Sequence, residues 1–410
     1  MVKVIATLCA VAVMASCASG SPPAVSSADP AKAAEIMRIV NDYMKEAHLK
    51  SVILKVSVDG QDIVTTAVGE SMTGVPATVD MHFRNGAVAI SYVSTLLMIL
   101  VDEKKVSLGD LVSKYRPDLP NSDRVRLGQL AQMTSGYHDF VLGNEEFSNV
   151  ALADPFKAWT TQEQLDLAVN KPLWFEPGTN FSYAHTNYVI LGLVLEKATG
   201  KPMADLLQEK VLDPLGLKNT RPNLTAQIPE PVLHAFTSER RSFFNIADGQ
   251  SFYEESTFWN PSWTINHGAI QTSNITDLHT TAIAIGTGKL LSPESHQALV
   301  STGMRGKTTP VDGCGTCVAL NDFRTYGLGV WISGSWIFQN PLFYGYAAVD
   351  SYLPSKKVAI AVAVTYLPEA FSDKGAYPNG GDALFRKIGA LLAPDEAPPV
   401  ATAESDKQHG

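Results

Sequence analysis

One stretch of the chain is almost wholly apolar. From Ala87 to Val101 it has no charged residue, and only hydroxyl side chains interrupt it. This pattern predicts a helix over about residues 87–103 that is buried on all sides, since it is too short and too interrupted for a convincing membrane span. The N-terminus of such a helix presents free N–H groups and a partial positive charge, which suits a nucleophile or an anion. The residues there, Ala87 and Ile90, carry no reactive group.

Strand patterns occur towards both ends of the chain. Alternating residues on either side of Asp59-Gly60 predict a hairpin over 51–68. Near the C-terminus we predict strands over 326–332, 342–352 and 358–366. Helical spacing predicts the elements 29–46, 127–133, 161–169, 188–199, 203–211, 274–285 and 381–392.

This order of elements predicts an α+β fold. Two strands at the start and three at the end imply one antiparallel sheet that is built from both chain ends, with helices on its faces. The helical middle, about residues 105–300, is then a large insertion within a domain that spans 32–392. Residues 393–410 are rich in Pro, Ala and acidic residues, and we predict a disordered tail there.

The first residues have the composition of an export signal. Lys3 precedes an apolar core, and Met14-Ala-Ser-Cys17 resembles a bacterial lipobox in which Cys17 is lipidated. We therefore expect a signal over 1–17, a tether over 18–31, and an extracytoplasmic protein anchored to the bacterial cell membrane through Cys17. The alternative is a plain signal that is cleaved nearby, which would give a secreted protein.

Net charge and cysteine content argue against several classes of partner and site. The formal net charge of −9 over 410 residues argues against nucleic acid as a partner. In an oxidising compartment, Cys314 and Cys317 in a Gly-rich loop favour a local disulfide. A redox role would need the pair at a helix start after a strand, and one pair offers too few ligands for zinc. We expect no metal and no cofactor.

Several stretches in order resemble the serine β-lactamases and penicillin-binding D,D-peptidases, in particular the branch of class C β-lactamases and related esterases. The resemblance covers most of residues 32–392. It rests on FRNG at 83–86 before the apolar helix, VSLGDLVSKY at 106–115, LAQMTSG at 130–136, FSYAHTNYVILG at 181–192, VLDPLGL at 211–217, GAIQTSNITDL at 268–278 and GYAAVDSYLP at 345–354.

The resemblance implies a β-lactamase/transpeptidase-like fold and a serine hydrolase site, but this chain departs from the family's catalytic pattern. The family's nucleophilic Ser falls on Ala87, and the Lys three residues on falls on Ile90. The family's Tyr is retained as Tyr183, whereas His185 stands where the family has Asn. The strand motif His/Lys-Ser/Thr-Gly falls on Gln339-Asn340-Pro341, and Pro341 lacks the N–H that a paired strand needs.

Three functions are compatible with these departures. The first is a non-catalytic envelope lipoprotein whose cleft, with Gln339 and Asn340 among its binding residues, holds a peptide, a peptidoglycan fragment or a protein partner. The second is an esterase or amidase with altered machinery that uses Tyr183 and His185. The third is a purely structural lipoprotein. The aromatic loop 239–263 either walls a pocket or packs beneath itself.

Overall fold

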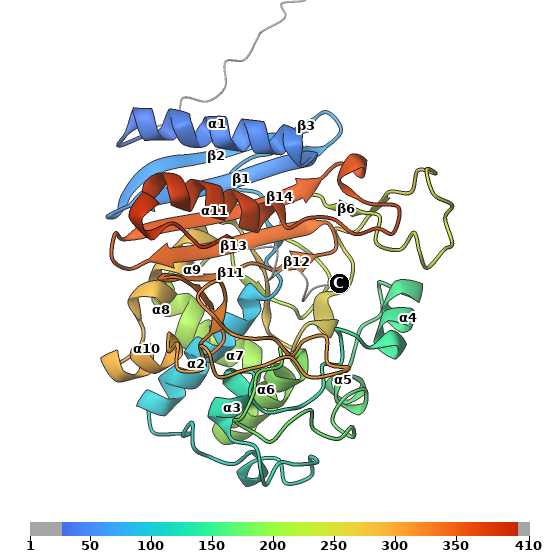
Figure 1. Ribbon diagram of the computed structural model, residues 1–410, viewed down its shortest axis with the longest axis vertical. Coiled ribbons are helices and arrows are strands. Elements are labelled where there is room, and N and C mark those ends of the chain that lie inside the picture. The colour runs from blue at the N-terminus through green and yellow to red at the C-terminus, as the bar shows by residue number, and fades with distance from the viewer. Residues whose placement is uncertain (1–26, 401–410) are drawn as a thin grey trace, which may run out of the picture.

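An antiparallel sheet built from both ends of the chain is the framework of the fold (Figure 1). The computed structural model describes residues 27–400. The strand order is β3-β2-β1-β14-β13-β11-β10-β9, with β12 paired to β13, and two smaller sheets have the orders β4-β8-β5 and β6-β7. This arrangement confirms the predicted fold class.

The strands are β1 (Leu49–Val58), β2 (Gln61–Met72), β3 (Val75–Pro76), β4 (Phe83–Arg84), β5 (Arg221–Pro222), β6 (Phe236–Thr237), β7 (Glu254–Glu255), β8 (Ile270–Ser273), β9 (Thr325–Tyr326), β10 (Trp331–Ser333), β11 (Trp336–Gln339), β12 (Leu342–Phe343), β13 (Tyr346–Leu353) and β14 (Val358–Tyr366).

The α-helices are α1 (Pro30–Glu46), α2 (Val88–Asp102), α3 (Leu127–Ala131), α4 (Glu145–Ala153), α5 (Thr161–Asp166), α6 (His185–Thr199), α7 (Met203–Leu207), α8 (Asp213–Leu215), α9 (Ile275–Thr287), α10 (Pro293–Leu299) and α11 (Gly380–Leu392). Short turns of other helix types are η1 (Val112–Lys114), η2 (Gln208–Leu212), η3 (Pro261–Trp263), η4 (Pro368–Ala370) and η5 (Pro394–Glu396).

Local sequence explains the centre of the sheet. Asp59 and Gly60 both adopt positive φ, at 48° and 77°, as a two-residue hairpin turn between β1 and β2 requires. Every residue of β14 is buried, because this strand lies between β1 and β13 and is covered on both faces. Its continuous apolar run is typical of such a central strand.

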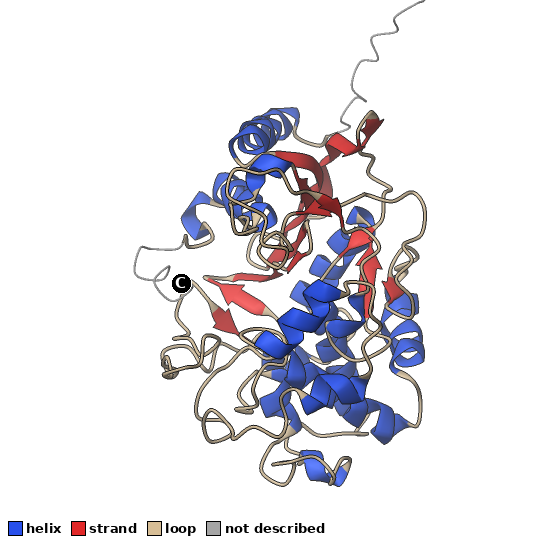
Figure 2. Ribbon diagram, turned by 90° about the vertical axis from the view of Figure 1, so that its right-hand side faces the viewer, coloured by secondary structure: helices blue, strands red, loops and turns tan. Residues whose placement is uncertain are grey.

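Helices cover the two faces of the sheet in separate layers (Figures 1 and 2). Helices α1 and α11 lie on the outer face, where their apolar stripes form one core with β1, β13 and β14. Asp29 caps the N-terminus of helix α1, and its carboxylate accepts the Lys32 N–H. Helix α9 lies on the other face and connects the sheet to a larger core around α2 and α6.

Helix α2 is buried over most of its length, as the apolar run predicts. Its hydroxyl groups are satisfied within the core: Tyr92 bonds Thr281 of α9 at 2.7 Å, and Ser94 bonds Tyr188 of α6 at 2.6 Å. The helix therefore joins the sheet side of the molecule to the helical side. In residues 27–400, no helix has the length and apolar character needed to cross a membrane.

Two predicted strands are wrong in detail. The stretch 326–332 is not one strand, because Gly327 and Gly329 separate β9 from β10. The stretch 342–352 is divided by a turn at Tyr344-Gly345, where both residues have positive φ. The structure also contains β11 and helices α4 and α10, which we did not predict.

The residues at both ends of the described range 27–400 are ordered parts of the domain. Residues 393–400, which we assigned to a disordered tail, instead pack on the domain: the Trp336 indole donates to the Glu396 carbonyl, and Ser355 donates to the Glu396 carboxylate. Helix α1 begins at Pro30, two residues before the expected start of the domain. The signal, Cys17 and the rest of the tail lie outside the described residues.

Two glycines allow a test of how closely the β9–β10 loop packs on the helices. Gly329 and Gly74 both have φ of 74°. A Cβ at Gly329 would lie 2.1 Å from the Ser94 hydroxyl and 2.6 Å from that of Tyr188, whereas nothing lies within 4 Å at Gly74. We expect Gly74→Ala to lower the free energy of unfolding by about 1–2 kcal/mol, the cost of positive φ. Gly329→Ala should cost about 1–3 kcal/mol more through overpacking.

Urea unfolding of both variants measures the difference. Equal losses of stability would show that the loop is not packed tightly against the pair Ser94 and Tyr188.

Candidate functional site

The site is organised around the start of α2. Strand β4 pairs with β8, and Gly86 then turns the chain into the helix with φ of 48°. A Cβ at Gly86 would lie 2.6 Å from the Pro341 Cβ, so only glycine allows this close approach. Strand β11 ends at Gln339 and β12 begins at Leu342, which leaves Pro341 in a gap between paired segments, as the missing N–H requires.

The two residues that replace the family's Ser and Lys are apolar and part of the packing. Ala87 is the N-cap of α2, is half-buried and makes no side-chain capping bond. Ile90 is 1% exposed and belongs to the larger core. Neither position offers a nucleophile or a base.

Tyr183 is held in place by rings and by a disulfide loop. Its ring lies parallel to Trp331, with centroids 6.1 Å apart, and edge-on to Tyr326. Its backbone N–H donates to Thr316, inside the loop that the predicted Cys314–Cys317 disulfide closes. Burial raises the pKa of Tyr183 well above its ordinary value, and the charge of Asp139 adds to this effect. The phenol therefore stays protonated and keeps its O–H group.

His185 is the first residue of α6 and is bound to a buried carboxylate. Its Nδ1 lies 3.0 and 3.2 Å from the two oxygens of Asp139. Asp139 also accepts the N–H groups of Val141, Leu142 and His185, at 3.0–3.2 Å. Its side chain is 1% exposed, and that of His185 is 12% exposed. A carboxylate fixed in this way holds the imidazole in one orientation.

Sequence reasoning missed Asp139 because no short motif joins it to His185, 46 residues away. The only available signal was its place three residues after the Thr-Ser-Gly stretch at 134–136.

The aromatic loop contributes Trp263 to the site. The Trp263 ring lies 6.1 Å from that of His185 and stacks on Phe343 at 5.4 Å. Its indole N–H is buried and has no partner in residues 27–400. Phe243 and Phe244, by contrast, pack on one another in a different part of the loop. The rings of this loop thus pack on neighbouring rings, as the second interpretation of the loop expects.

The side-chain hydrogen bonds that the structure shows for Gln339 and Asn340 go to partners other than Tyr183 and His185. Gln339 is 1% exposed, and its amide donates to the Gly329 carbonyl. The Asn340 amide donates to Asp382 of α11, on the outer layer of the molecule.

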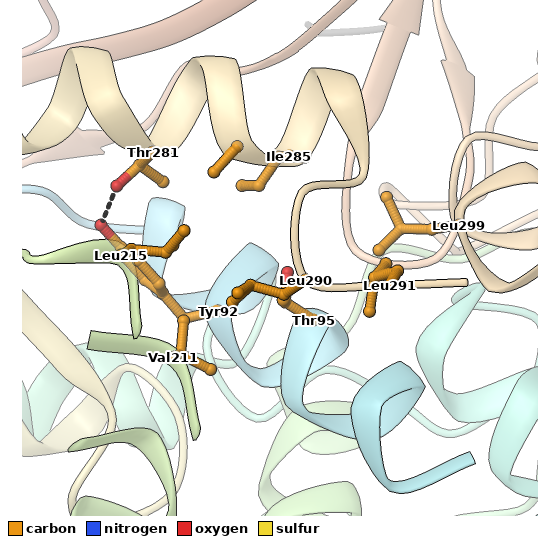
Figure 3. A pocket seen from close by; sticks show the side chains of 10 residues that line it. Tyr92, Thr95, Val211, Leu215, Thr281, Ile285, Leu290, Leu291 and Leu299 are labelled. Carbon is orange, nitrogen blue, oxygen red and sulfur yellow. Dashed lines mark hydrogen bonds between the residues drawn. The ribbon is translucent and has the colours of Figure 1, made fainter. Parts of the chain in front are cut away.

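A separate cavity lies between α2, α9 and residues 290–299 (Figure 3). Its lining is apolar apart from hydroxyl groups, and the dashed line in Figure 3 shows that Tyr92 and Thr281 already bond each other. With a volume of about 10 Å³, it has room for one water molecule at most. It does not include Ala87, Tyr183 or His185. Nowhere in residues 27–400 do three or more His, Cys, Asp or Glu gather in a way that could hold a metal ion.

A carboxyl group links the aromatic loop to the turn beside the site. The Oε2 atom of Glu239 accepts the hydroxyls of Thr237 at 2.7 Å and Tyr377 at 3.3 Å. Tyr377 in turn accepts the Gly345 N–H, next to Tyr344, whose ring contacts Trp263. Burial raises the pKa of Glu239 to about 7.

Comparison with known proteins agrees with this architecture. The sequence model of the Beta-lactamase family matches residues 36–385. The chain belongs to the Beta-lactamase family. Penicillin-binding protein 4 of Amycolatopsis lactamdurans is 34% identical over 180 residues, which cover 42% of this chain and 44% of that protein. This Beta-lactamase family chain therefore spans less than half the length of the curated relatives it matches.

Solved structures share the fold of this Beta-lactamase family chain at low identity. The D-amino acid amidase of Ochrobactrum anthropi SV3, complexed with D-phenylalanine, has a TM-score of 0.71 at 21% identity and covers 90% of this chain and 100% of its own. A D-stereospecific amidohydrolase of a Streptomyces species has a TM-score of 0.68 at 21% identity, with coverages of 88% and 98%. At this identity the likeness establishes the fold alone.

The raised pKa of Glu239 predicts a pH-dependent stability. Between pH 4.5, its ordinary pKa, and about 7, the folded protein keeps a proton that the unfolded chain releases. The contribution of Glu239 is therefore fully present below pH 4.5 and is lost as the pH rises through about 7, at a cost of about 1–3 kcal/mol.

Urea unfolding of the wild type and of Glu239→Gln, from below pH 4.5 to above pH 7, measures the contribution of Glu239. We expect the wild type to lose more stability than the variant as the pH rises. Parallel pH profiles would show that folding does not raise the pKa of Glu239.

Proposed function

We propose that this protein is a cell-envelope lipoprotein that binds a peptide, a peptidoglycan fragment or a protein partner in its cleft and has lost the acyl-serine chemistry of its family. The observation that carries the proposal is the burial of Ile90 in the larger core, next to Ala87 at the start of α2. Acyl transfer by the family's route needs a hydroxyl at the first position and an amine at the second.

The apolar residues Ala87 and Ile90 are physically consistent with each other. A Lys at position 90 without its Ser would be a buried, unpaired charge that costs several kcal/mol. Ile turns that position into ordinary core and gains the free energy of apolar burial. The retained fold, with Tyr183 beside His185, keeps a surface on which a ligand can be held without a covalent bond.

The relatives support the choice of ligand. Those matched in sequence and structure include a penicillin-binding protein, a D-stereospecific amidohydrolase and an amidase complexed with D-phenylalanine. A cleft derived from such proteins is a reasonable place for a peptide-like ligand.

Covalent labelling tests the loss of acyl-serine chemistry. We expect a fluorescent penicillin and a fluorophosphonate to leave the mass of the purified protein unchanged. Ala87→Ser alone should also remain unlabelled, because position 90 still lacks the amine that activates the hydroxyl. Intact-protein mass spectrometry reads both results, and a stoichiometric adduct on the wild type would refute the proposal.

A second candidate, hydrolysis of an ester or amide, is favoured by the bond between His185 and Asp139. In this reaction Nε2 of His185 removes a proton from water, and the resulting hydroxide adds to the substrate carbonyl. The Tyr183 hydroxyl donates a hydrogen bond to the oxyanion. The imidazolium returns the proton to the leaving group as its bond to carbon breaks.

Hydrolysis of p-nitrophenyl butyrate tests this second candidate. If it operates, His185→Ala should lower the rate by about 10²–10⁴-fold through loss of the base, and Tyr183→Phe should lower it through loss of the donor. His234→Ala is a matched control, since His234 also bonds a carboxylate, that of Glu255, away from the site. Hydrolysis that survives both site substitutions would rule out these residues.

A further inference from the structure

Large apolar side chains gather on two exposed segments outside the site. In residues 27–400, nine large hydrophobic residues are exposed, and four of them lie within residues 142–156 or 242–252. The four are Leu142, Val150, Phe156 and Phe244, with exposed fractions of 49%, 38%, 63% and 45%. Single apolar residues on a surface need no explanation, but several on neighbouring segments indicate a surface that another molecule covers.

Arg240 shows that the two segments are neighbours. Its Nε atom donates to the Leu152 carbonyl in the last turn of α4 at 2.7 Å, and its guanidinium lies 4.6 Å from the centre of the Phe244 ring. Phe156 follows the end of α4 by three residues. Figure 1 shows α4 beside the loop that leaves β6. We call residues 142–156 and 242–252 together the α4 surface.

Buried residues hold both segments in place. On α4, the Phe147 ring is 4% exposed and packs on Trp159 with centroids 5.0 Å apart. In the loop, the Arg241 guanidinium donates to the carbonyls of Ala247 and Gln250, at 3.1 and 3.0 Å. The exposed residues are therefore presented on an ordered frame, so a partner that binds there has few additional groups to order.

Acidic groups surround the exposed rings. Residues 142–156 and 242–252 contain no Lys or Arg, and their four acidic residues are Glu145, Glu146, Asp154 and Asp248. The adjacent Arg240 and Lys157 already pair with carboxylates outside these two ranges. Lys374 lies beside the loop, since its carbonyl accepts a hydroxyl from it, and offsets one of the four acids. The α4 surface is therefore both apolar and negatively charged.

This charge decides between the possible occupants of the surface. An anionic lipid surface attracts basic groups and is disfavoured by the four carboxylates. A second copy of this chain has the same formal net charge of −9, and a symmetric pair would place the acidic surface against itself. A protein segment that carries both apolar and basic side chains matches both features of the surface.

We propose that the α4 surface docks a segment of another protein that carries both apolar and basic side chains. The apolar side chains of this partner cover Val150, Phe156 and Phe244, and its basic side chains pair with the surrounding carboxylates. The surface lies outside the site that contains Tyr183 and His185. The inference therefore does not depend on the ligand or the chemistry of that site.

Three synthetic peptides test the chemistry of the partner. The probe is a peptide of Leu and Lys in helical spacing. One control peptide has Glu in place of Lys, and the other has Ser in place of Leu. We expect isothermal titration calorimetry to show saturable binding of the probe to the wild-type protein, and added salt should weaken it. Each control peptide should bind about tenfold more weakly, because it lacks one of the two features.

Substitutions test whether the probe binds to the α4 surface. Phe156→Ser and Phe244→Ser should each weaken binding about tenfold, and Glu145→Gln combined with Glu146→Gln should weaken it about threefold. Leu224→Ser is the matched control for the apolar changes, since Leu224 is 52% exposed outside the α4 surface, and it should leave binding unchanged. Because all these side chains are exposed, the variants keep the buried core intact, and urea unfolding of each variant checks this.

The matched control for charge is Glu35→Gln combined with Glu46→Gln, two exposed acids on α1, which should leave binding unchanged. Equal binding by the wild type and the Phe156→Ser and Phe244→Ser variants would overturn the inference, as would equal binding of all three peptides. Phosphatidylglycerol vesicles that bind the wild type but not these two variants would assign the surface to lipid instead. Self-association that these variants lose, measured by sedimentation equilibrium, would assign it to a second copy, and either result would also overturn the inference.

Discussion

The burial of α2 is the constraint on which the rest of the structure depends. The helix lies between the sheet with its covering helix α9 and the helical region around α6. Because the segment 341–343 also contacts Gly86, the start of the helix is where these parts meet. Any residue placed at this start is surrounded by groups from distant parts of the chain. Such a position can hold several catalytic groups close together. A charge left unpaired there would be costly in free energy.

The order of elements could be predicted from sequence because its signals are local. The hairpin turn at Asp59-Gly60, the apolar run of α2 and the continuous apolar pattern of β14 each depend on a few adjacent residues. The strands around residues 326–352 could not be placed correctly. Turns at Gly327, Gly329 and Tyr344-Gly345 interrupt stretches whose apolar residues continue, so periodicity alone does not show where each strand ends.

Only part of the site could be predicted from the sequence, because two of its residues depend on contacts between distant parts of the chain. The resemblance to the family's motifs singled out Tyr183 and His185 and aligned Ala87 and Ile90 with the family's Ser and Lys. Asp139 and Trp263 could not be assigned in this way, since each acts through contacts across some 46 to 78 positions of the chain. The departure at 185 has a physical meaning only with Asp139 present, because the carboxylate determines which ring nitrogen faces outward.

The Cys314–Cys317 disulfide makes the support of Tyr183 sensitive to the redox conditions around the protein. Its Thr316 bonds both the backbone of Tyr183 and the hydroxyl of Ser182, so the loop is a short clip behind the tyrosine. If Cys314 and Cys317 were reduced, the disulfide would no longer close the loop, and Tyr183 would lose part of its support. The support behind the Tyr183 ring thus depends on the Cys314–Cys317 disulfide, which forms and persists under oxidising conditions.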